Sequence, residues 1–185
     1  MSSFATPEEL SAYTMGLLSP SDTRSDIILA GATKAIQNFC GWNIAPAEDL
    51  VIYLDGGTAE LFLPTLKLNS VESITVEDVP LADTDFEWSR ITGNVRRKDL
   101  SAFPEVWGGI VVDYNSGYAA VPEELKQIVL QVSALALSSP TGATKEQAGQ
   151  VAMSWGTTAP GVAGGLTLLD RDYSVLSKYV LPKEA

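Results

Sequence analysis

The stretch VDYNSGYAAVPEELK, Val112 to Lys126, predicts a change from strand to helix within a few residues. Gly117 is free to take a positive φ in the turn between them. Pro122 suits the first turn of a helix, because its fixed φ is already helical. Glu123 and Glu124 then fall where the helix dipole favours carboxylates. No obvious catalytic group lies in this sharply marked junction.

The helix that follows has the cleanest apolar period in the chain. Its apolar residues recur at helical spacing: Leu125, Ile128, Val129, Val132, Leu135 and Ala136. Such a stripe predicts an amphipathic helix with one face in a core. The sequence SSP, Ser138 to Pro140, ends it.

Two helices are expected before the junction. Thr6 and Glu9 form a capping box around Pro7, which predicts a short helix ending near Gly16. SPSD, Ser19 to Asp22, has the same capping-box pattern with Asp in place of Glu, and it predicts a longer helix to about residue 39. The apolar face expected for this helix is Ile28, Ala32, Ile36 and Phe39.

A β region is expected between these helices and the junction. LVIYL (Leu50 to Leu54) and TAELFL (Thr58 to Leu63) flank DGG, which predicts a hairpin. Further strands are predicted at residues 71–78, 85–91 and 107–114.

The composition changes after Pro140. Gly, Ala, Thr, Ser and Pro dominate up to Gly165, which is typical of a flexible linker. A short strand is predicted at residues 150–155 and a final amphipathic helix at residues 167–179. We therefore expect a core over residues 1–139 and a Gly/Ala/Thr-rich arm with a C-terminal helix over residues 140–185.

Composition excludes several classes of function. With 23 acidic and 12 basic residues the net charge is −11, so tight nucleic-acid binding is not expected, although the acidity can equally serve solubility alone. Histidine is absent, which removes Ser-His-Asp and Cys-His catalysis. Cys40 is the only cysteine. No signal peptide, membrane span, P-loop or metal motif is recognised, and we expect no cofactor, no metal and no enzyme activity.

Two charged clusters leave alternatives open. VEDVPLADTDFEW is interpreted as a solvated acidic hairpin around a Pro-containing turn, or as an acidic surface facing DNA or a basic partner; its acids are Glu77, Asp78, Asp83, Asp85 and Glu87. Paired carboxylates could also serve a small hydrolase, the least favoured reading. Arg96, Arg97 and Lys98 form the only basic cluster; it could bind phosphate or nucleic acid, but pairing with carboxylates within or between subunits is expected instead.

Aromatic residues near element ends are candidates for interfaces. Trp42, Trp107, Trp155 and Tyr179 lie at such positions, and aromatics are enriched in protein interfaces. Core packing is an equal alternative for Trp42 and Trp107. Trp155, inside the Gly-rich arm, is the better interface candidate.

An ordered series of short motifs covers nearly the whole chain. FCGW closes the paired N-terminal helices, and LFLPTLKLNSVESITVED, DFEWSRITGNVRR, VVDYNSGYAAVPEELKQIVLQVSALAL and GGLTLLDRDYSVLSKY follow. In these motifs and their order the sequence resembles the head–tail connector (adaptor) proteins of long-tailed phages.

The resemblance implies a fold and an assembly. The fold would be α+β: a helical bundle, with a small antiparallel β element of hairpins between the N-terminal helices and a long core helix, and an extended C-terminal arm ending in a helix. About a dozen copies would form a homo-oligomeric ring. The portal protein would lie above it, a stopper or tail-completion protein below, and double-stranded DNA would pass through without specific binding.

The implied location is the virion neck, after synthesis in the host bacterial cytoplasm and without a membrane. Another neck role, such as stopper or tail-completion protein, is the main alternative. A structural junction is implied for Tyr114, Gly117, Tyr118 and Pro122, which would fix the angle between sheet and helix. The expected partner-binding residues are Trp155, Leu169, Tyr173, Leu176 and Tyr179, and residues from about Gln150 onward are expected to reach the portal or a neighbouring subunit.

Overall fold

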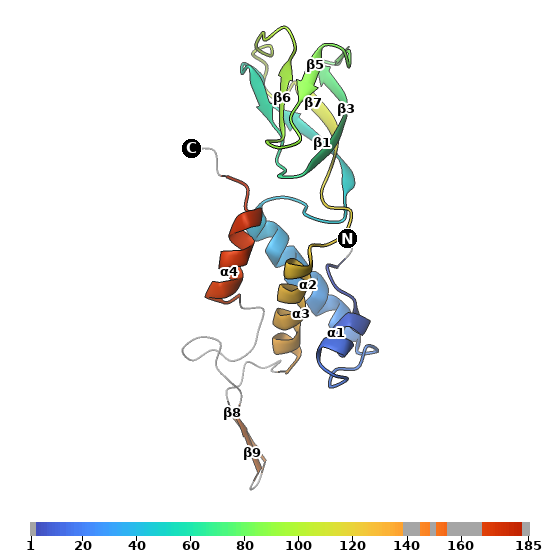
Figure 1. Cartoon of the computed structure of the whole chain (residues 1–185), viewed down its shortest axis with the longest axis vertical. Helices are drawn as coiled ribbons and strands as arrows, with labels where there is room; N and C mark the ends of the chain where they lie inside the picture. The colour runs from blue at the N-terminus through green and yellow to red at the C-terminus, as the bar shows by residue number, and fades with distance from the viewer. Residues whose placement is uncertain (1–2, 139–144, 149–150, 155–167, 183–185) are drawn as a thin grey trace. The chain divides into compact units, whose positions relative to one another are not determined.

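The computed structural model describes residues 3–138, 145–148, 151–154 and 168–182 (Figure 1). The fold is mixed α+β, and the chain forms two compact units. We call residues 1–40 with 122–180 the helical unit, and residues 41–121 with 181–185 the β unit. The division expected after residue 139 falls outside the described residues and stays a prediction.

The described helices all belong to the helical unit. They are α1 (Pro7–Tyr13), α2 (Thr23–Cys40), α3 (Glu123–Ser138) and α4 (Asp170–Leu176), which continues into a 3-10 turn at Ser177–Tyr179. The predicted start of α1 is confirmed in detail. The N–H of Glu9 donates to the Thr6 hydroxyl at 3.2 Å, and the N–H of Thr6 donates to the Glu9 carboxylate at 2.9 Å.

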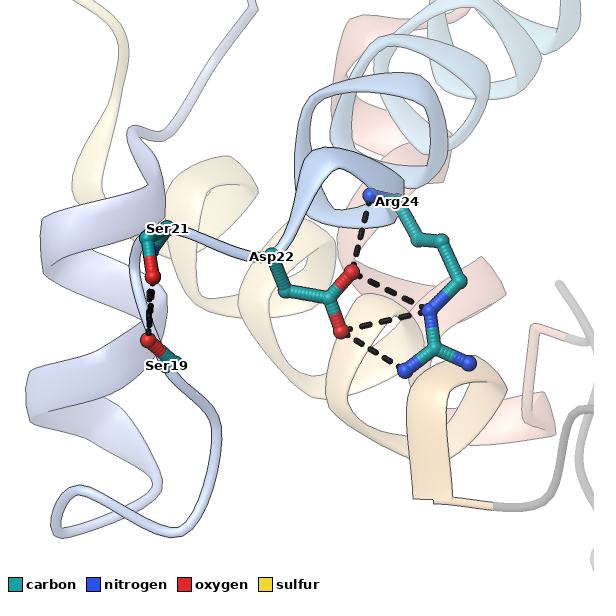
Figure 2. A network of polar contacts seen from close by, with 4 residues as sticks. All are labelled: Ser19, Ser21, Asp22 and Arg24. Atoms are coloured by element: carbon teal, nitrogen blue, oxygen red, sulfur yellow. Dashed lines mark hydrogen bonds and ion pairs between the residues drawn. The ribbon is translucent and has the colours of Figure 1, made fainter.

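Helix α2 begins later than predicted. It starts at Thr23, because the carboxylate of Asp22 accepts the N–H of Arg24 at 3.0 Å and so caps the first turn (Figure 2). The same carboxylate accepts the Arg24 guanidinium at 2.7 Å, and these bonds lower the pKa of Asp22 to about 2. Ser19, the expected cap, instead shares a hydrogen bond of 2.8 Å with the hydroxyl of Ser21.

The buried face of α2 is turned relative to the predicted one. Ile28 is half-buried and Phe39 is 42% exposed. The residues that are buried are Ser25, Leu29, Ala32, Thr33, Ile36 and Cys40. Thr33 explains the shift, because its hydroxyl accepts the buried N–H of Phe4 at 3.0 Å. A polar residue therefore belongs to the face that apolar periodicity alone assigned differently.

Helix α3 confirms the predicted apolar stripe. It begins directly after Pro122, whose carbonyl accepts the N–H groups of Leu125 and Lys126 at 3.0 and 3.1 Å. Most residues of the predicted face are buried, and Leu135 is half-buried. Leu130, Ser133 and Leu137 are buried as well, which makes the buried face wider than expected.

Two antiparallel sheets make up the β unit. The four-stranded sheet has the order β1-β7-β3-β4, formed by Glu48–Leu54, Ile110–Ser116, Leu68–Val76 and Val79–Leu81. The three-stranded sheet has the order β2-β6-β5, formed by Glu60–Phe62, Asn94–Arg97 and Phe86–Trp88. A separate two-stranded sheet pairs β8 (Lys145–Ala148) with β9 (Val151–Ser154). The short strand predicted at residues 150–155 corresponds to β9.

Both larger sheets contribute to one apolar core. Its buried residues come from the two sheets and the loops between them: Leu61, Leu63, Leu68, Ile74, Phe86, Val95, Phe103, Ile110, Val112 and Tyr114. The β part is thus a unit with its own core, larger than the small hairpin element expected from the sequence.

The hairpin predicted around DGG does not form. Strand β1 pairs with β7 and strand β2 with β6, so the two segments flanking DGG are not partners. The glycines instead bind a distant loop: the N–H of Gly56 donates to Val106 at 2.8 Å and that of Gly57 to Phe103 at 3.1 Å. A Cβ on Gly56 would lie 1.8 Å from the carbonyl oxygen of Pro104. Backbone hydrogen bonds to a loop distant in the sequence therefore determine the structure here, and the local turn signal does not.

The acidic hairpin also turns at a different place. Glu77 and Asp78 occupy the two-residue turn between β3 and β4, with φ of 47° and 65°. Pro80 lies in β4, an edge strand, where its missing N–H costs no ladder bond. The strand expected at residues 85–91 shortens to β5, and Ile91 lies outside it.

Candidate interaction surfaces

Three of the predicted junction residues, Tyr114, Gly117 and Tyr118, belong to the β unit, whereas Pro122 belongs to the helical unit. Tyr114 is buried in β7, and burial raises the pKa of its hydroxyl. Gly117 has φ of 109°, and a Cβ there would lie 3.1 Å from the carbonyl oxygen of Ile44. The N–H of Tyr118 donates to the same carbonyl at 2.7 Å. Gly117 is therefore needed for both its φ and its close approach. The angle that the junction is expected to set stays a prediction.

An acid–base–acid ladder crosses the three-stranded sheet. Glu60 and Glu87 both stand opposite Arg96 in register, one on each neighbouring strand. The Arg96 guanidinium donates to Glu87 at 2.6 Å, and the side-chain amide of Asn94 donates to Glu60 at 2.7 Å. These four residues, with Trp88, line a surface pocket of about 380 Å³. Cross-strand pairing explains the ladder, so Glu60 and Asn94 could be found only once the strand partners were known.

The five predicted acidic residues are all exposed. Glu77 and Asp78 occupy the β3–β4 turn, and Asp83 and Asp85 lie in the following loop. Glu87 is different, since Arg96 of the same chain neutralises it. The proposed partner of these acids, whether DNA or a basic protein, stays a prediction.

The basic cluster is divided between two environments. Arg96 belongs to the ladder, and Arg97 contacts Asp99 at 3.3 Å. The carboxylate of Asp99 also accepts both the hydroxyl and the N–H of Ser101, which together with Arg97 lowers its pKa. Lys98 is exposed. The expected pairing between subunits stays a prediction.

The aromatic candidates differ in their exposure to solvent. Trp42 is buried, whereas Trp107 is 89% exposed in a loop of the β unit. The carboxylate of Asp55 accepts the N–H of Gly108 at 2.6 Å and so holds this loop beside the DGG turn. Sequence reasoning missed this use of Asp55. Trp155 lies outside the described residues.

The predicted partner residues of the C-terminal helix lie at different depths. Leu176 is fully buried in the helical unit, and Leu169 is half-buried. Tyr173 is 42% exposed, with its ring edge-on to Phe39 at a centroid distance of 5.2 Å. The Tyr179 hydroxyl donates to Glu124 at 2.7 Å. Of these residues, Tyr173 offers the most surface to a partner.

Neither a metal-binding group nor a membrane-spanning helix is found among the described residues. They contain no group of acidic, cysteine or histidine side chains that could hold a metal ion. No described helix is both long enough and apolar enough to cross a membrane. Cys40 is buried, and burial raises the pKa of its thiol to about 11, so the thiol stays protonated at neutral pH.

A model of the head completion protein family matches residues 6–132. The chain belongs to this family. The match covers α1, α2, all seven strands of the β unit and most of α3. It confirms the connector family recognised from the sequence motifs. The family is a structural one rather than a family of enzymes.

Solved structures from gene transfer agent (GTA) particles share the fold. A chain from the neck of a native GTA particle with C12 symmetry has a TM-score of 0.55 at 15% identity, covering 98% of this chain and 94% of that chain. A chain from the neck of an empty GTA particle with C6 symmetry has a TM-score of 0.60 at 14% identity, covering 98% and 91%.

A third similar chain comes from the virion of a native gene transfer agent particle. Its TM-score is 0.55 at 16% identity, covering 89% of this chain and 80% of that chain. Among curated proteins, no sequence match was found. The likeness to these structures shows the fold shared along most of the chain.

Proposed function

We propose that the chain is a ring-forming head–tail adaptor that joins the portal of a DNA-filled capsid to the tail. The match of the head completion family over residues 6–132 carries this proposal. Chains of the same fold come from GTA necks described with C12 and C6 symmetry, which supports a ring in a neck. The ring would lie in the virion, between the portal and a stopper or tail-completion protein.

The first test is electron microscopy of particles made with this gene alone disabled. We expect emptied or DNA-leaking heads beside separate, complete tails, because the joint between them would be missing. Restoring the wild-type gene from a plasmid should restore joined particles. Normal, infectious virions without the gene would contradict the proposal.

A stopper role is the second candidate. The β unit favours it, because seven strands with their own core are more than the small element expected of an adaptor. The two roles differ in position along the neck. Labelling the chain in intact particles would separate them, since an adaptor contacts the portal directly and a stopper lies one ring further from the head.

The acidic turn is our candidate for the surface that faces DNA. Glu77 and Asp78 are exposed, and like charge would let DNA pass without being held. Replacing both with lysine should slow DNA ejection and strengthen its dependence on salt. The control replaces Glu8 and Asp26, exposed acids of the helical unit, with the same change in net charge. Equal ejection rates in both double variants would exclude this surface.

Binding of the C-terminal helix to the portal is tested most sharply at its exposed aromatic ring. Deleting the whole arm would also remove Leu176, which is buried in the helical unit, and so would disturb folding. Tyr173→Ala removes an exposed ring and keeps that core. We expect fewer joined particles with Tyr173→Ala. Unchanged joining would remove Tyr173 from the proposed interface.

A further inference from the structure

The two larger sheets have four edge strands, and three of them are protected. Edge strands present unpaired N–H and C=O groups, which proteins usually guard with short length, proline, charge or a bulge. Strands β2, β4 and β5 have three residues each, and β4 also contains Pro80. Strand β1 has seven residues, and it pairs only with β7 among the described strands.

Strand β1 lacks each of these protections along most of its length. Its register with β7 runs without a shift from Glu48 to Leu54, so no bulge twists the edge away. It contains no proline and no lysine, and its two charges lie at one end. Val51 and Tyr53, which share one face, are 59% and 70% exposed. The segment from Leu50 to Leu54 is thus an apolar edge without a bulge, open to another strand.

The β8–β9 pair, in contrast, lacks a third strand. It is a separate two-stranded sheet with four residues in each strand. A hairpin of this kind is marginally stable in water, and a third strand is needed for stable order. The sequence of β9, VAMS, carries no charge, whereas β8 begins with lysine and glutamate. Strand β9 could therefore join an apolar edge without burying a charge.

We propose that β9 of one copy pairs with β1 of the neighbouring copy, so that each sheet continues across the subunit boundary. The joined sheet would have the order β8-β9-β1-β7-β3-β4. The contact uses two different surfaces of the same chain, which is the kind of interface that closes a ring. Main-chain bonds would supply affinity, and alternate side chains the register. This inference rests on the proposed function, which requires copies side by side.

Disulfide trapping in assembled particles tests the pairing. Val51→Cys is combined with Ala152→Cys or, in a second variant, with Met153→Cys. Adjacent strand residues face opposite sides, so one of the two can meet position 51. The native Cys40 is buried and remains unreactive. After mild oxidation we expect a ladder of covalent oligomers on a non-reducing gel in one of the two variants.

The matched control uses the protected edge of the same sheet. Val79 in β4 is 67% exposed, close to the exposure of Val51. Val79→Cys combined with the same cysteines should give monomers only. A ladder of equal strength from Val79→Cys would overturn the proposal. So would an intrachain disulfide with Val51→Cys, because it would place β9 on its own β1.

A charge on the edge gives an independent readout. Val51→Lys should reduce joined particles at least about tenfold, because an edge lysine blocks strand addition. Val79→Lys should leave their number unchanged, and circular dichroism of the purified chains checks that both variants fold. Equal numbers of particles from Val51→Lys and wild type would overturn the pairing.

The outcomes also separate this pairing from the proposed function. If particles contain the chain but the cysteine pairs stay uncrosslinked, the strand addition is wrong and the adaptor role stands. If particles lack the wild-type chain, the adaptor role is wrong. The same cysteine pairs in the purified, concentrated full chain then decide the strand addition: a ladder supports it, and monomers alone overturn it.

Discussion

The helical unit and the β unit depend on different kinds of contact. In the helical unit, helices carry their own start signals and meet through apolar faces, with a few polar bonds between distant residues such as Thr33 and Phe4. In the β unit, backbone groups of distant segments contact each other directly. The N–H of Gly56, for example, donates to the carbonyl of Val106. Side-chain packing can adjust to a small change, whereas backbone contact at van der Waals distance cannot.

This difference determines which substitutions destabilise each unit most. A substitution in the helical unit should cost what the lost contact contributes. A substitution at a close backbone approach in the β unit should force whole segments apart.

Gly56→Ala should have the largest effect. Its Cβ would stand 1.8 Å from the carbonyl oxygen of Pro104, so the loop that holds the DGG turn must move. We expect the free energy of unfolding to fall by more than about 4 kcal/mol, the range of severe substitutions. Urea unfolding followed by tryptophan fluorescence measures it, because Trp42, Trp88 and Trp107 belong to the β unit.

Gly108→Ala is the matched control for that experiment. Gly108 has φ of +61°, and a Cβ there meets nothing within 4 Å. Gly108→Ala should lower the free energy of unfolding only by the cost of holding alanine in the left-handed backbone region, about 1–2 kcal/mol. If the two alanines destabilise equally, backbone proximity is not what sets the sensitivity of the β unit.

Sequence reasoning succeeded in the helical unit where the signals are local. The capping box of Thr6 and Glu9 and the apolar stripe of α3 involve residues within a few turns of one another. It predicted helix α2 but only part of its buried face, in which Ala32 and Ile36 are joined by Thr33. Thr33 accepts the backbone N–H of Phe4, and apolar periodicity does not count polar residues that find distant partners.

The β unit was harder to predict for the same physical reason. DGG carries a strong local hairpin signal, yet β1 pairs with β7, more than fifty residues further on. Nothing in the local sequence identifies that partner. The ladder of Glu60, Arg96 and Glu87 depends on such pairing too, so a search for charge runs found Arg96 and Glu87 but not Glu60.

Thr33→Val should have an intermediate effect in the helical unit. Valine keeps the shape of threonine but removes the acceptor of the Phe4 N–H, which is buried. An unsatisfied buried donor costs about 1–3 kcal/mol. Far-UV circular dichroism during unfolding should report the loss, because all described helices lie in this unit.

Thr33→Ser separates the hydrogen bond from the packing. Serine keeps the acceptor and loses one methyl group, so it should cost about 0.8 kcal/mol, the value of one buried carbon. If Thr33→Ser destabilises the unit more than Thr33→Val, packing of the methyl group dominates and the bond to Phe4 contributes little.

Glu9→Gln should have the smallest effect, and the effect should depend on pH. The carboxylate of Glu9 accepts the N–H of Thr6 at 2.9 Å and the ammonium of Lys126 at 3.0 Å. The capping bond first, and then Lys126, hold the pKa of Glu9 below its usual 4.5. Glutamine can keep the capping bond but not the charge. Both partners are partly exposed, so screening should limit the loss at neutral pH to about 0.5 kcal/mol.

The sign of the pH dependence follows from the lowered pKa. A carboxyl whose pKa is depressed by folding stabilises the folded state fully above its unfolded pKa of about 4.5. That contribution is lost as the pH falls through the lower folded value, because the proton then binds in both states. Wild type should therefore lose more stability than Glu9→Gln when unfolding is measured below pH about 4.5. The two curves should converge at the acid end. Lys126→Met should flatten the difference only in part, because the capping bond, the largest single cause of the lowered pKa, remains. Parallel curves for wild type and Glu9→Gln would show that this charge contributes nothing to the helical unit, whose stability would then come from its apolar faces and neutral hydrogen bonds.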